Sequence, residues 1–433
     1  MSRSSGLPDG PPGLVRRLGT GDAVVLGLGS MLGAGVFSAF APAAAAAGTG
    51  LLLGLAVAAV VALCNATSSA QLAAQHPLSG GTYVYGREQL GPWWGFVAGW
   101  SFVLGKSASC AAMALVFAAH TAPDGLERPV AVLAVLALAG VNLAGVTRTA
   151  GVTRVLLVVV LTALGVVVAA ALLGGQADAG RLASWDDPVG GGYGVLQSAG
   201  LLFFAFAGYA RIATLGEEVR DPARTIPRAV VSALAVAAAV YAAVAVALLA
   251  VLEPAQLARS SAPLVDAVEA GSLDALAPVV RAGAAAGALG ALLGLLAGVG
   301  RTVLAMSRGD DLPGWLGRVS PRTSVPHTAE VALALAVSGL VLTVDLRGAL
   351  GFSSFGVLLY YVVANLAALT QTGGHRRYPR ALQVLGAGGC AVLIITLPPA
   401  SVLAGLAVLA LGVAVRLLRR RDRSGPAGAR AGR

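Results

Sequence analysis

The stretch GSMLGAGVF, residues 29–37, lies at the centre of a long apolar run near the start of the chain and holds three glycines in nine residues. Each interior glycine costs a helix up to about 1 kcal/mol relative to alanine. The helix that this run predicts is therefore weakest at its own centre. We interpret the weak point as a place where the backbone itself is needed for a ligand.

The composition predicts a membrane protein, since 57% of the residues are hydrophobic and only 12% are charged. A soluble domain has roughly 45–50% apolar and about 25% charged residues. Apolar runs of about 20 residues, long enough to cross a bilayer, recur along the whole chain. The first run begins near Asp22 and has full length, so we expect a retained span and no cleaved signal peptide. The predicted fold is an all-α integral membrane protein with about 12 transmembrane helices, at residues 22–47, 49–73, 92–119, 129–146, 152–174, 194–216, 227–252, 277–305, 329–345, 349–371, 380–397 and 399–417.

Charge predicts the orientation of these spans. If the N-terminus lies inside, most loop arginines fall on the inner side, among them Arg87, Arg318 and Arg376, as the positive-inside rule requires. The protein is therefore expected in the cell membrane with both termini in the cytoplasm. The arginines on the inner side of the membrane account for the net charge of +10, so no nucleic-acid partner is expected. The arginines expected outside are Arg128, Arg181, Arg259, Arg281 and Arg347.

A second interruption occurs in LLFFAFAGYARIATLGEEV, residues 201–219, where Ala207 and Gly208 lie in the middle of predicted span six. It comes five spans after the first, which predicts two five-span repeats, one inverted relative to the other. Backbone groups freed at such breaks must be satisfied in hydrocarbon. Half-helix N-termini favour a carboxylate, and freed carbonyls favour an ammonium group, so a zwitterion fits both. The alternative is that these glycines serve only helix packing.

Four stretches of the chain carry a resemblance to a known family: GSMLGAGVF, HPLSGGTYVYGREQLGPWWGF (76–96), FFAFAGYARIATLGEEVRDPARTIPRAV (203–230) and GRTVLAMSRGDDLPGWLGRVSPRTSVP (300–326). Through them the chain resembles the amino acid–polyamine–organocation superfamily of permeases over essentially its whole length. The resemblance implies a ten-helix inverted-repeat core with two added helices, and alternating access around a site between spans one, three, six, eight and ten. It implies that amides around Gly33, Ala34 and Gly35 bind a substrate carboxylate. Carbonyls around Phe206 and Ala207 would bind the substrate amine, and Gly208 is a further candidate substrate contact.

This resemblance also divides the chain. We expect a cytoplasmic N-terminal segment at 1–21, the ten-helix transport core at 22–371, helices eleven and twelve at 372–417, and a basic, disordered cytoplasmic tail at 418–433. The segment 253–276 is too long for a simple turn and is expected to form short helices outside the membrane. After span six, Glu217, Glu218 and Arg220 are candidates for a cytoplasmic gate of ion pairs; the alternative is a structured loop.

Lys106 is the only lysine in the chain and falls in predicted span three, about fifteen residues past Gly91 and Pro92. At 1.5 Å per residue this is roughly 22 Å into the helix, near the membrane centre. A lysine there is a functional hypothesis by default, although snorkelling to an interface is the alternative. Lys106 is expected to exchange a proton during transport or to replace a bound cation with a fixed charge. Cys110 in the same stretch is a further candidate substrate contact.

Many relatives that move cationic substrates carry an acidic residue in the unwound part of span six, where this chain has Ala210. Relatives that bind sodium use hydroxyls in span eight, where this chain has none until Thr302. Some proton-driven relatives have a lysine in span five, which is missing here. These departures favour a neutral or mildly anionic substrate, with proton coupling or exchange. Among the aromatics, Phe204 is the candidate occluding lid and Phe352 a candidate contact; plain packing is the alternative for each.

The sequence therefore predicts a secondary active transporter of amino acids, neutral ones in the first instance. The alternatives are a cationic amino-acid or polyamine antiporter, and a sensor or accessory subunit that does not transport. No enzyme, cofactor or metal site is expected, because the four histidines lie far apart without Cys, Asp or Glu at metal-ligand spacing. The expected partners are the amino acid and the lipid bilayer. The sequence does not predict which amino acid is carried, the direction of transport or the oligomeric state.

Overall fold

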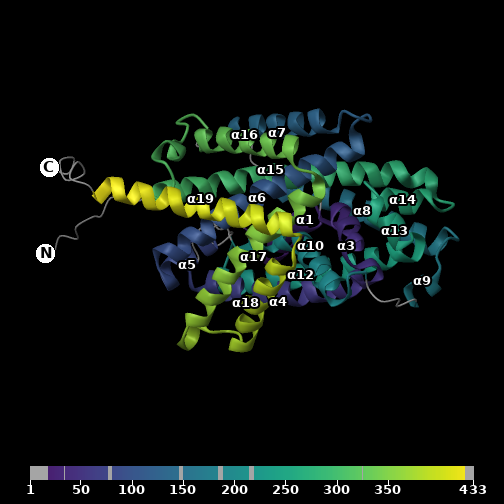
Figure 1. Cartoon of the computed structure of the whole chain (residues 1–433), viewed down its shortest axis with the longest axis horizontal. Helices are drawn as coiled ribbons and strands as arrows, with labels where there is room; N and C mark the ends of the chain where they lie inside the picture. Colours follow the sequence, from purple (N-terminus) through teal and green to yellow (C-terminus); the bar gives the residue numbers. More distant parts are fainter. Residues whose placement is uncertain are drawn as a thin grey trace.

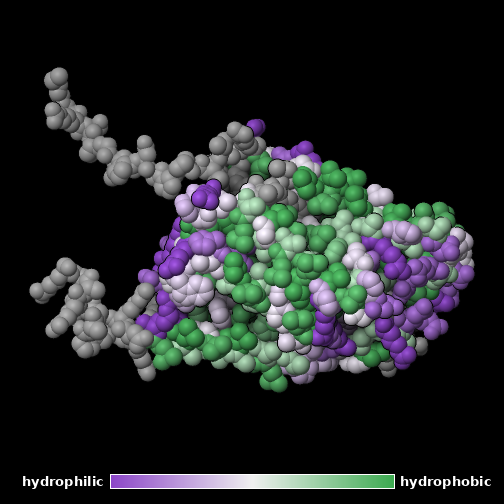
Figure 2. All heavy atoms as spheres, turned by 90° about the horizontal axis from the view of Figure 1, so that it is seen from above, coloured by the Kyte–Doolittle hydropathy of each residue, from purple (hydrophilic) through white to green (hydrophobic). Residues whose placement is uncertain are grey.

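The computed structural model describes residues 18–33, 35–76, 80–145, 150–183, 189–213, 219–323 and 325–424. Within these ranges the regular structure is helical, apart from one isolated parallel bridge between Leu18 and Val219. Nine helices in the described part of the chain are long and apolar enough to cross a membrane, and they lie roughly along the long axis (Figure 1). Figure 2 shows hydrophobic side chains over the middle of the molecule and hydrophilic ones gathered toward both ends.

Each predicted span coincides with helical structure, so the all-α membrane fold is confirmed. The three shortest, α7, α16 and α18, have 17 residues each, at the lower limit of about 17–25 residues for a spanning helix. The spanning elements are α1 (Thr20–Met31), α2 (Gly35–Ser38) and α3 (Phe40–Ala47), α4 (Leu51–Gln75), α6 (Pro92–Thr121), α7 (Glu127–Leu143), α8 (Ala150–Leu173), α10 (Gly191–Phe206), η2 (Ala207–Tyr209) and α11 (Ala210–Ala213), α12 (Pro222–Val251), α15 (Ala277–Arg308), α16 (His327–Thr343), α17 (Leu346–Thr370), α18 (Arg380–Thr396) and α19 (Pro399–Ser424).

The connecting segments hold shorter helices. The expectation of short helices at 253–276 is confirmed by α13 (Pro254–Arg259), α14 (Pro263–Glu269) and η3 (Asp274–Leu276). Helix α5 (Thr82–Leu90) follows α4 in a segment that the hydropathy pattern leaves as a connection, because its residues are too polar to form a span. The last helix, α19, continues to Ser424, so the predicted tail from 418 begins as helix; 425–433 lie outside the described residues.

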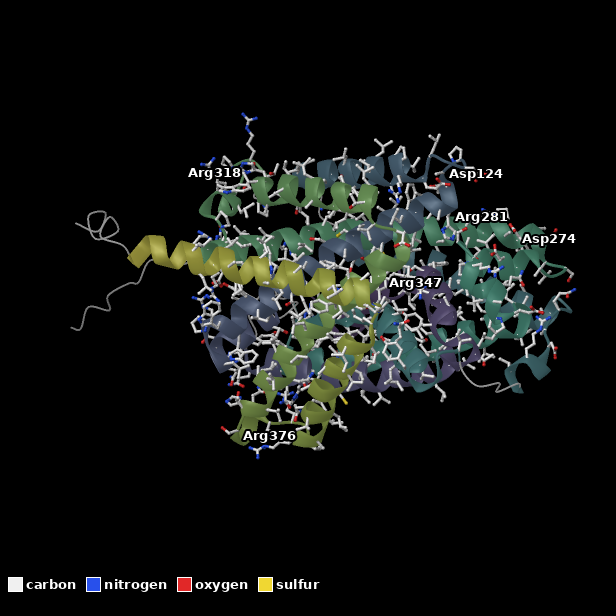
Figure 3. The ribbon with its side chains drawn as sticks, in the orientation of Figure 1. Asp124, Asp274, Arg281, Arg318, Arg347 and Arg376 are labelled. Atoms are coloured by element: carbon white, nitrogen blue, oxygen red, sulfur yellow. The ribbon has the colours of Figure 1, made fainter. Side chains whose placement is uncertain are left out.

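The molecule has two polar ends, which we name the α5 end and the α14 end after the helices that lie there (Figure 1). Figure 3 places Arg318 and Arg376 at the α5 end, with Asp124, Asp274 and Arg281 at the α14 end. Among the labelled arginines, Arg318 and Arg376, expected inside, thus lie at the opposite end from Arg281, expected outside, whereas Arg347, also expected outside, lies nearer the middle. The expectation that the α5 end faces the cytoplasm stays a prediction.

Close packing of small residues fixes where α6 meets α17. A β-carbon at Gly105 would lie 2.9 Å from the Ser353 carbonyl oxygen, and one at Gly356 would lie 2.6 Å from the Ser101 carbonyl oxygen. Each helix therefore needs a glycine where the other backbone approaches. One turn along, the hydroxyls of Ser109 and Ser353 are 2.7 Å apart. This contact holds the part of α6 that carries Lys106.

Candidate substrate site

The two helix interruptions predicted from the glycines meet at one place in the structure. Helix α1 ends at Met31 and α2 begins at Gly35, while η2 interrupts the path from α10 to α11. A β-carbon at Gly35 would lie 2.5 Å from the Ala205 Cα, and one at Gly208 would lie 2.5 Å from the Ser30 carbonyl oxygen. The obstructing atoms are backbone, which cannot rotate away. Only glycine therefore permits this crossing.

A tyrosine from α12 joins the two interruptions. The buried Tyr241 hydroxyl is 2.7 Å from the Met31 carbonyl oxygen and 2.9 Å from the Ala205 carbonyl oxygen. These carbonyls belong to the last turns of α1 and α10, where helix carbonyls lose their intrahelical partners. The Tyr241 hydroxyl is thus shared between one carbonyl oxygen from each broken helix. In an apolar interior such carbonyls need a hydrogen-bond donor from within the protein.

Lys106 approaches the same crossing from α6. Its side chain is only 6% exposed, and its ammonium nitrogen donates to the Ala207 carbonyl oxygen at 3.3 Å. None of the ion pairs formed among the described residues includes Lys106. The buried ammonium group of Lys106 thus faces the interruption of span six. Its partner there is a backbone carbonyl group and not a carboxylate.

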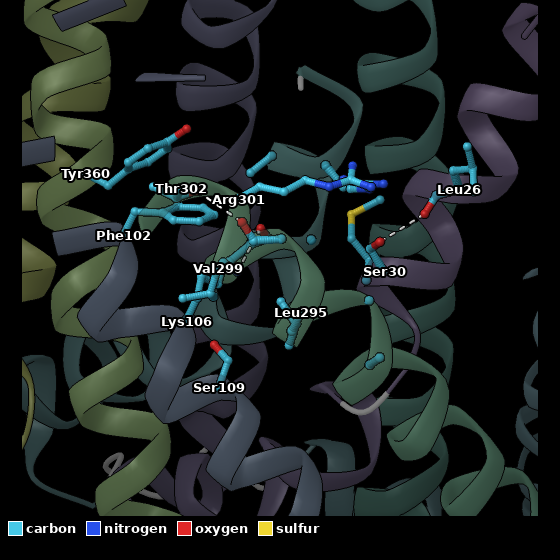
Figure 4. Close-up of a pocket in the computed structure, with 18 of the residues that line it drawn as sticks. Leu26, Ser30, Phe102, Lys106, Ser109, Leu295, Val299, Arg301, Thr302 and Tyr360 are labelled. Carbon is cyan, nitrogen blue, oxygen red and sulfur yellow. Dashed lines mark hydrogen bonds between the residues drawn. The ribbon is translucent and has the colours of Figure 1, made fainter. Parts of the chain in front are cut away.

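A pocket of about 380 Å³ opens beside the crossing (Figure 4). Its lining comes mainly from α1, α6, α10, η2, α11, α15 and α17, which correspond to spans one, three, six, eight and ten. On α1 it uses residues that precede the interruption, and it also includes Tyr83 of α5, so the pocket lies on the α5 side of the crossing. Its volume falls within the roughly 300–1,000 Å³ range of small-molecule sites.

Five of the residues singled out from the sequence line this pocket together. They come from four elements, α2, α6, α10 and η2, of which only α10 and η2 are adjacent in sequence. They are Gly35, Lys106, Phe204, Ala207 and Gly208.

Other candidates lie elsewhere. Gly33 packs against α15, where a β-carbon on it would lie 2.9 Å from the Ala291 Cβ. Cys110 is fully buried, and Phe206 packs edge-on against Tyr241 with ring centroids 5.0 Å apart; neither lines the pocket. Phe352 is half-buried on α17 and is also absent from the lining. Ala34 lies outside the described residues.

The candidate gate residues Glu217 and Glu218 also lie outside the described residues. Arg220 is exposed, and its backbone N–H donates to the Leu18 carbonyl oxygen at 2.9 Å. The sequence did not predict the ion pairs that the structure shows at this end. We name the strongest group of them, formed by Asp311, Arg416, Arg87 and Tyr83, the Asp311 cluster.

The Asp311 cluster joins α19, α5 and the loop that follows α15. Asp311 and Arg416 are both 3% exposed and lie 2.6 Å apart, while Arg87 pairs with the same carboxylate at 3.4 Å. The Tyr83 hydroxyl donates to Asp311 at 3.0 Å. Burial, and then the charge of Asp311, raise the pKa of Tyr83 to about 12, so this hydroxyl keeps its proton at physiological pH. The Arg416 guanidinium also lies 4.5 Å from the ring centroids of Trp93 and Phe96.

Sequence reasoning missed several residues of the site. Arg301 falls inside predicted span eight and Arg416 inside predicted span twelve, which was an available signal, since arginines are rare in spans. For Tyr241 no comparable signal exists, because a tyrosine in an apolar run is ordinary. Within the described ranges, no group of three or more His, Cys, Asp or Glu residues is placed to hold a metal ion.

Sequence comparisons relate the chain to known proteins. The amino acid permease family model matches residues 22–415. An uncharacterized transporter of Mycobacterium tuberculosis is 57% identical over 99% of this chain and 98% of its own length. A branched-chain amino acid permease of Bacillus subtilis is 26% identical over 96% of this chain and 95% of its own. A chloroplastic cationic amino acid transporter of Arabidopsis thaliana is 28% identical over 79% of this chain and 63% of its own.

Proposed function

We propose that this chain, which belongs to the amino acid permease family, is a secondary active transporter. It moves an amino acid across the membrane by alternating access. The observation that carries this proposal is the crossing of two interrupted helices at the wall of a small-molecule pocket. Interrupted helices in matching places of two repeats are typical of substrate sites in secondary transporters.

The proposed pose follows from the backbone groups at the crossing. The substrate carboxylate binds amides around Gly33, Ala34 and Gly35, where the second half of the first broken helix begins. The substrate ammonium binds carbonyl oxygens around Phe206 and Ala207. Phe204, which lines the pocket and is 8% exposed, closes over the bound substrate from the outer side.

The proposed substrate has no positively charged side chain, and a neutral amino acid is the starting assignment. Ala210 lines the pocket where cation-moving members of the family carry an acidic residue. Among the described lining residues none is Asp or Glu, so a second positive charge on the substrate would lack a counter-ion. Three of the relatives carry cationic amino acid transporter names, but no observation at the pocket favours a cationic amino-acid or polyamine antiporter.

The proposed coupling is to protons or to a second amino acid. Lys106 supplies a fixed or exchangeable positive charge beside the crossing, where sodium-driven members would hold a cation. The Thr302 hydroxyl on α15 donates to the Gly298 carbonyl oxygen of its own helix at 3.1 Å, which leaves it a weak ligand for sodium. We place the protein in the cell membrane with both termini in the cytoplasm. Glu217, Glu218 and Arg220 form the proposed cytoplasmic gate.

The test is counterflow in proteoliposomes, with each of the twenty amino acids inside and the same labelled amino acid outside. The proposal predicts accumulation for a subset of amino acids without dibasic members, in the absence of sodium. A proton gradient should drive net uptake if coupling is to protons, and only exchange should occur otherwise. Accumulation of arginine, lysine or polyamines alone would overturn the substrate assignment. No counterflow of any amino acid would support a sensor or accessory role.

A further inference from the structure

The pocket beside the crossing has a lining of one charge sign. Four cationic side chains contribute to it: Lys106 from α6, Arg211 from α11, and Arg301 and Arg308 from α15. None of the lining residues that the structure describes is an aspartate or a glutamate. The neutral polar groups at the wall are hydroxyls, including those of Ser30 and Ser109. Such a lining repels cations and attracts anions.

The inner position of Lys106 sets it apart from the arginines. Arg301 and Arg308 have exposed side chains on the half of α15 that is nearer the α5 end, and the charge of Glu330 acts on Arg301. Lys106 is buried in the middle of α6, beside the crossing, and only the Ala207 carbonyl accepts from it among the described residues. In Figure 4 Lys106 and Arg301 both reach the pocket, from different helices. Lys106 therefore differs from these two arginines in being buried, and none of the ion pairs among the described residues includes it.

Glu330, a buried acidic group near the pocket, is not one of its lining residues. Glu330 of α16 is buried behind α15, where a β-carbon at Gly300 would lie 2.5 Å from its Oε1 atom. It attracts Arg301 from that side but does not line the pocket. No such group faces Lys106 among the lining residues that the structure describes. An ammonium group held at the membrane centre is costly unless an anion accompanies it in the working protein.

We propose that the substrate carries a net negative charge: it is an amino acid with an acidic side chain, and Lys106 binds the side-chain carboxylate. This inference rests on the proposed transport function, and it replaces the neutral starting assignment of the substrate with an acidic amino acid. The α-carboxylate and α-ammonium groups occupy the two helix interruptions as proposed above. The Ala207 carbonyl then accepts from both the α-ammonium and Lys106, and the side-chain carboxylate offsets the repulsion between these two cations. Arg301 and Arg308 attract the anion toward the pocket.

The test compares isosteric ligand pairs on the unmodified protein in nanodiscs. Glutamate and glutamine differ in charge but hardly in shape, and so do aspartate and asparagine. We expect the acidic member of at least one pair to bind at least tenfold more tightly than its amide, which corresponds to about 1.4 kcal/mol. Equal or tighter binding of the amide in both pairs would overturn the inference.

A substitution then assigns the charge to Lys106. Lys106→Met keeps most of the length of the side chain and removes its charge. We expect it to weaken binding of the acidic ligand at least tenfold and to leave binding of the amide within about threefold. Arg347→Gln, at an exposed arginine that does not line the pocket, is the matched control and should change both affinities by less than about threefold. An equal loss for both ligands in Lys106→Met would contradict a charge-specific contact.

The two proposals fail differently. If a neutral amino acid such as leucine binds and neither acidic amino acid does, the inference is refuted and the transport function stands. If none of the twenty amino acids binds or is exchanged, the transport function is refuted and the inference with it. The ligand pairs are measured on the unmodified protein, so the outcome does not depend on the folding of a variant.

Discussion

Replacing Asp311 should destabilise the protein far more than breaking an equally short ion pair on the surface. Asp311 and Arg416 lie 2.6 Å apart with both side chains 3% exposed. Glu269 and Arg281 lie 2.8 Å apart with both side chains 45% exposed. The two pairs thus match in distance and differ in burial. Removing one partner of a buried pair costs about 3–5 kcal/mol, because it leaves an uncompensated buried charge. An exposed pair contributes about 0–1 kcal/mol.

Asp311→Asn should therefore lower the folded-to-unfolded ratio by about two to three and a half orders of magnitude. Glu269→Gln should lower it by less than one order. The assay is unfolding by SDS titration from mixed micelles, followed by tryptophan fluorescence, with Trp93 close to the Arg416 guanidinium as a local reporter. The double variant Asp311→Leu with Arg416→Met removes both buried charges and should recover most of the loss. A loss in Asp311→Asn no larger than that in Glu269→Gln would refute the reasoning.

Three further predictions concern the pocket and the crossing. Gly298→Ala should stabilise the protein by up to about 1 kcal/mol, because Gly298 lies inside α15 and a β-carbon there would meet no atom within 4 Å. Thermal unfolding in nanodiscs measures the shift. Tyr241→Phe leaves the carbonyls of Met31 and Ala205 without their shared donor and should cost about 1–3 kcal/mol in the same assay; an unchanged melting temperature would contradict it. Ala210→Asp adds a carboxylate to the pocket wall and should raise the affinity for arginine at least tenfold relative to alanine in equilibrium binding, while unchanged selectivity would show that this position does not contact the substrate.

The interrupted helices could be predicted from the sequence because their cause is local. Glycines at 33, 35 and 208 weaken helices wherever they fall, and the hydropathy of the flanking residues places the two weak points within spans. The isolation of Lys106 in an apolar run likewise indicates a functional position without any knowledge of its neighbours. The helices of residues 22–417 and the two interruptions could therefore be predicted from the sequence.

The contacts between helices could not be predicted in the same way. The pairing of Asp311 with Arg416 joins α19 to a distant loop, and hydropathy does not specify which face of a helix meets which neighbour. Because the chain is rich in alanine and glycine, small side chains do not mark one side of a span. The sequence therefore does not show which side of each helix faces a neighbouring helix. For the same reason Cys110 and Phe206 could not be separated from the residues that line the pocket.

The central claim is that an amino acid binds where the two interrupted helices cross. The most direct measurement is equilibrium binding of the labelled amino acid identified by counterflow to Gly208→Ala, with Gly298→Ala as the matched glycine control. A β-carbon at Gly208 would lie 2.5 Å from the Ser30 backbone, whereas one at Gly298 meets no atom within 4 Å, although both glycines line the pocket. The account predicts at least a tenfold weaker affinity for folded Gly208→Ala and an unchanged affinity for Gly298→Ala. Equal affinities in the two folded variants would contradict it.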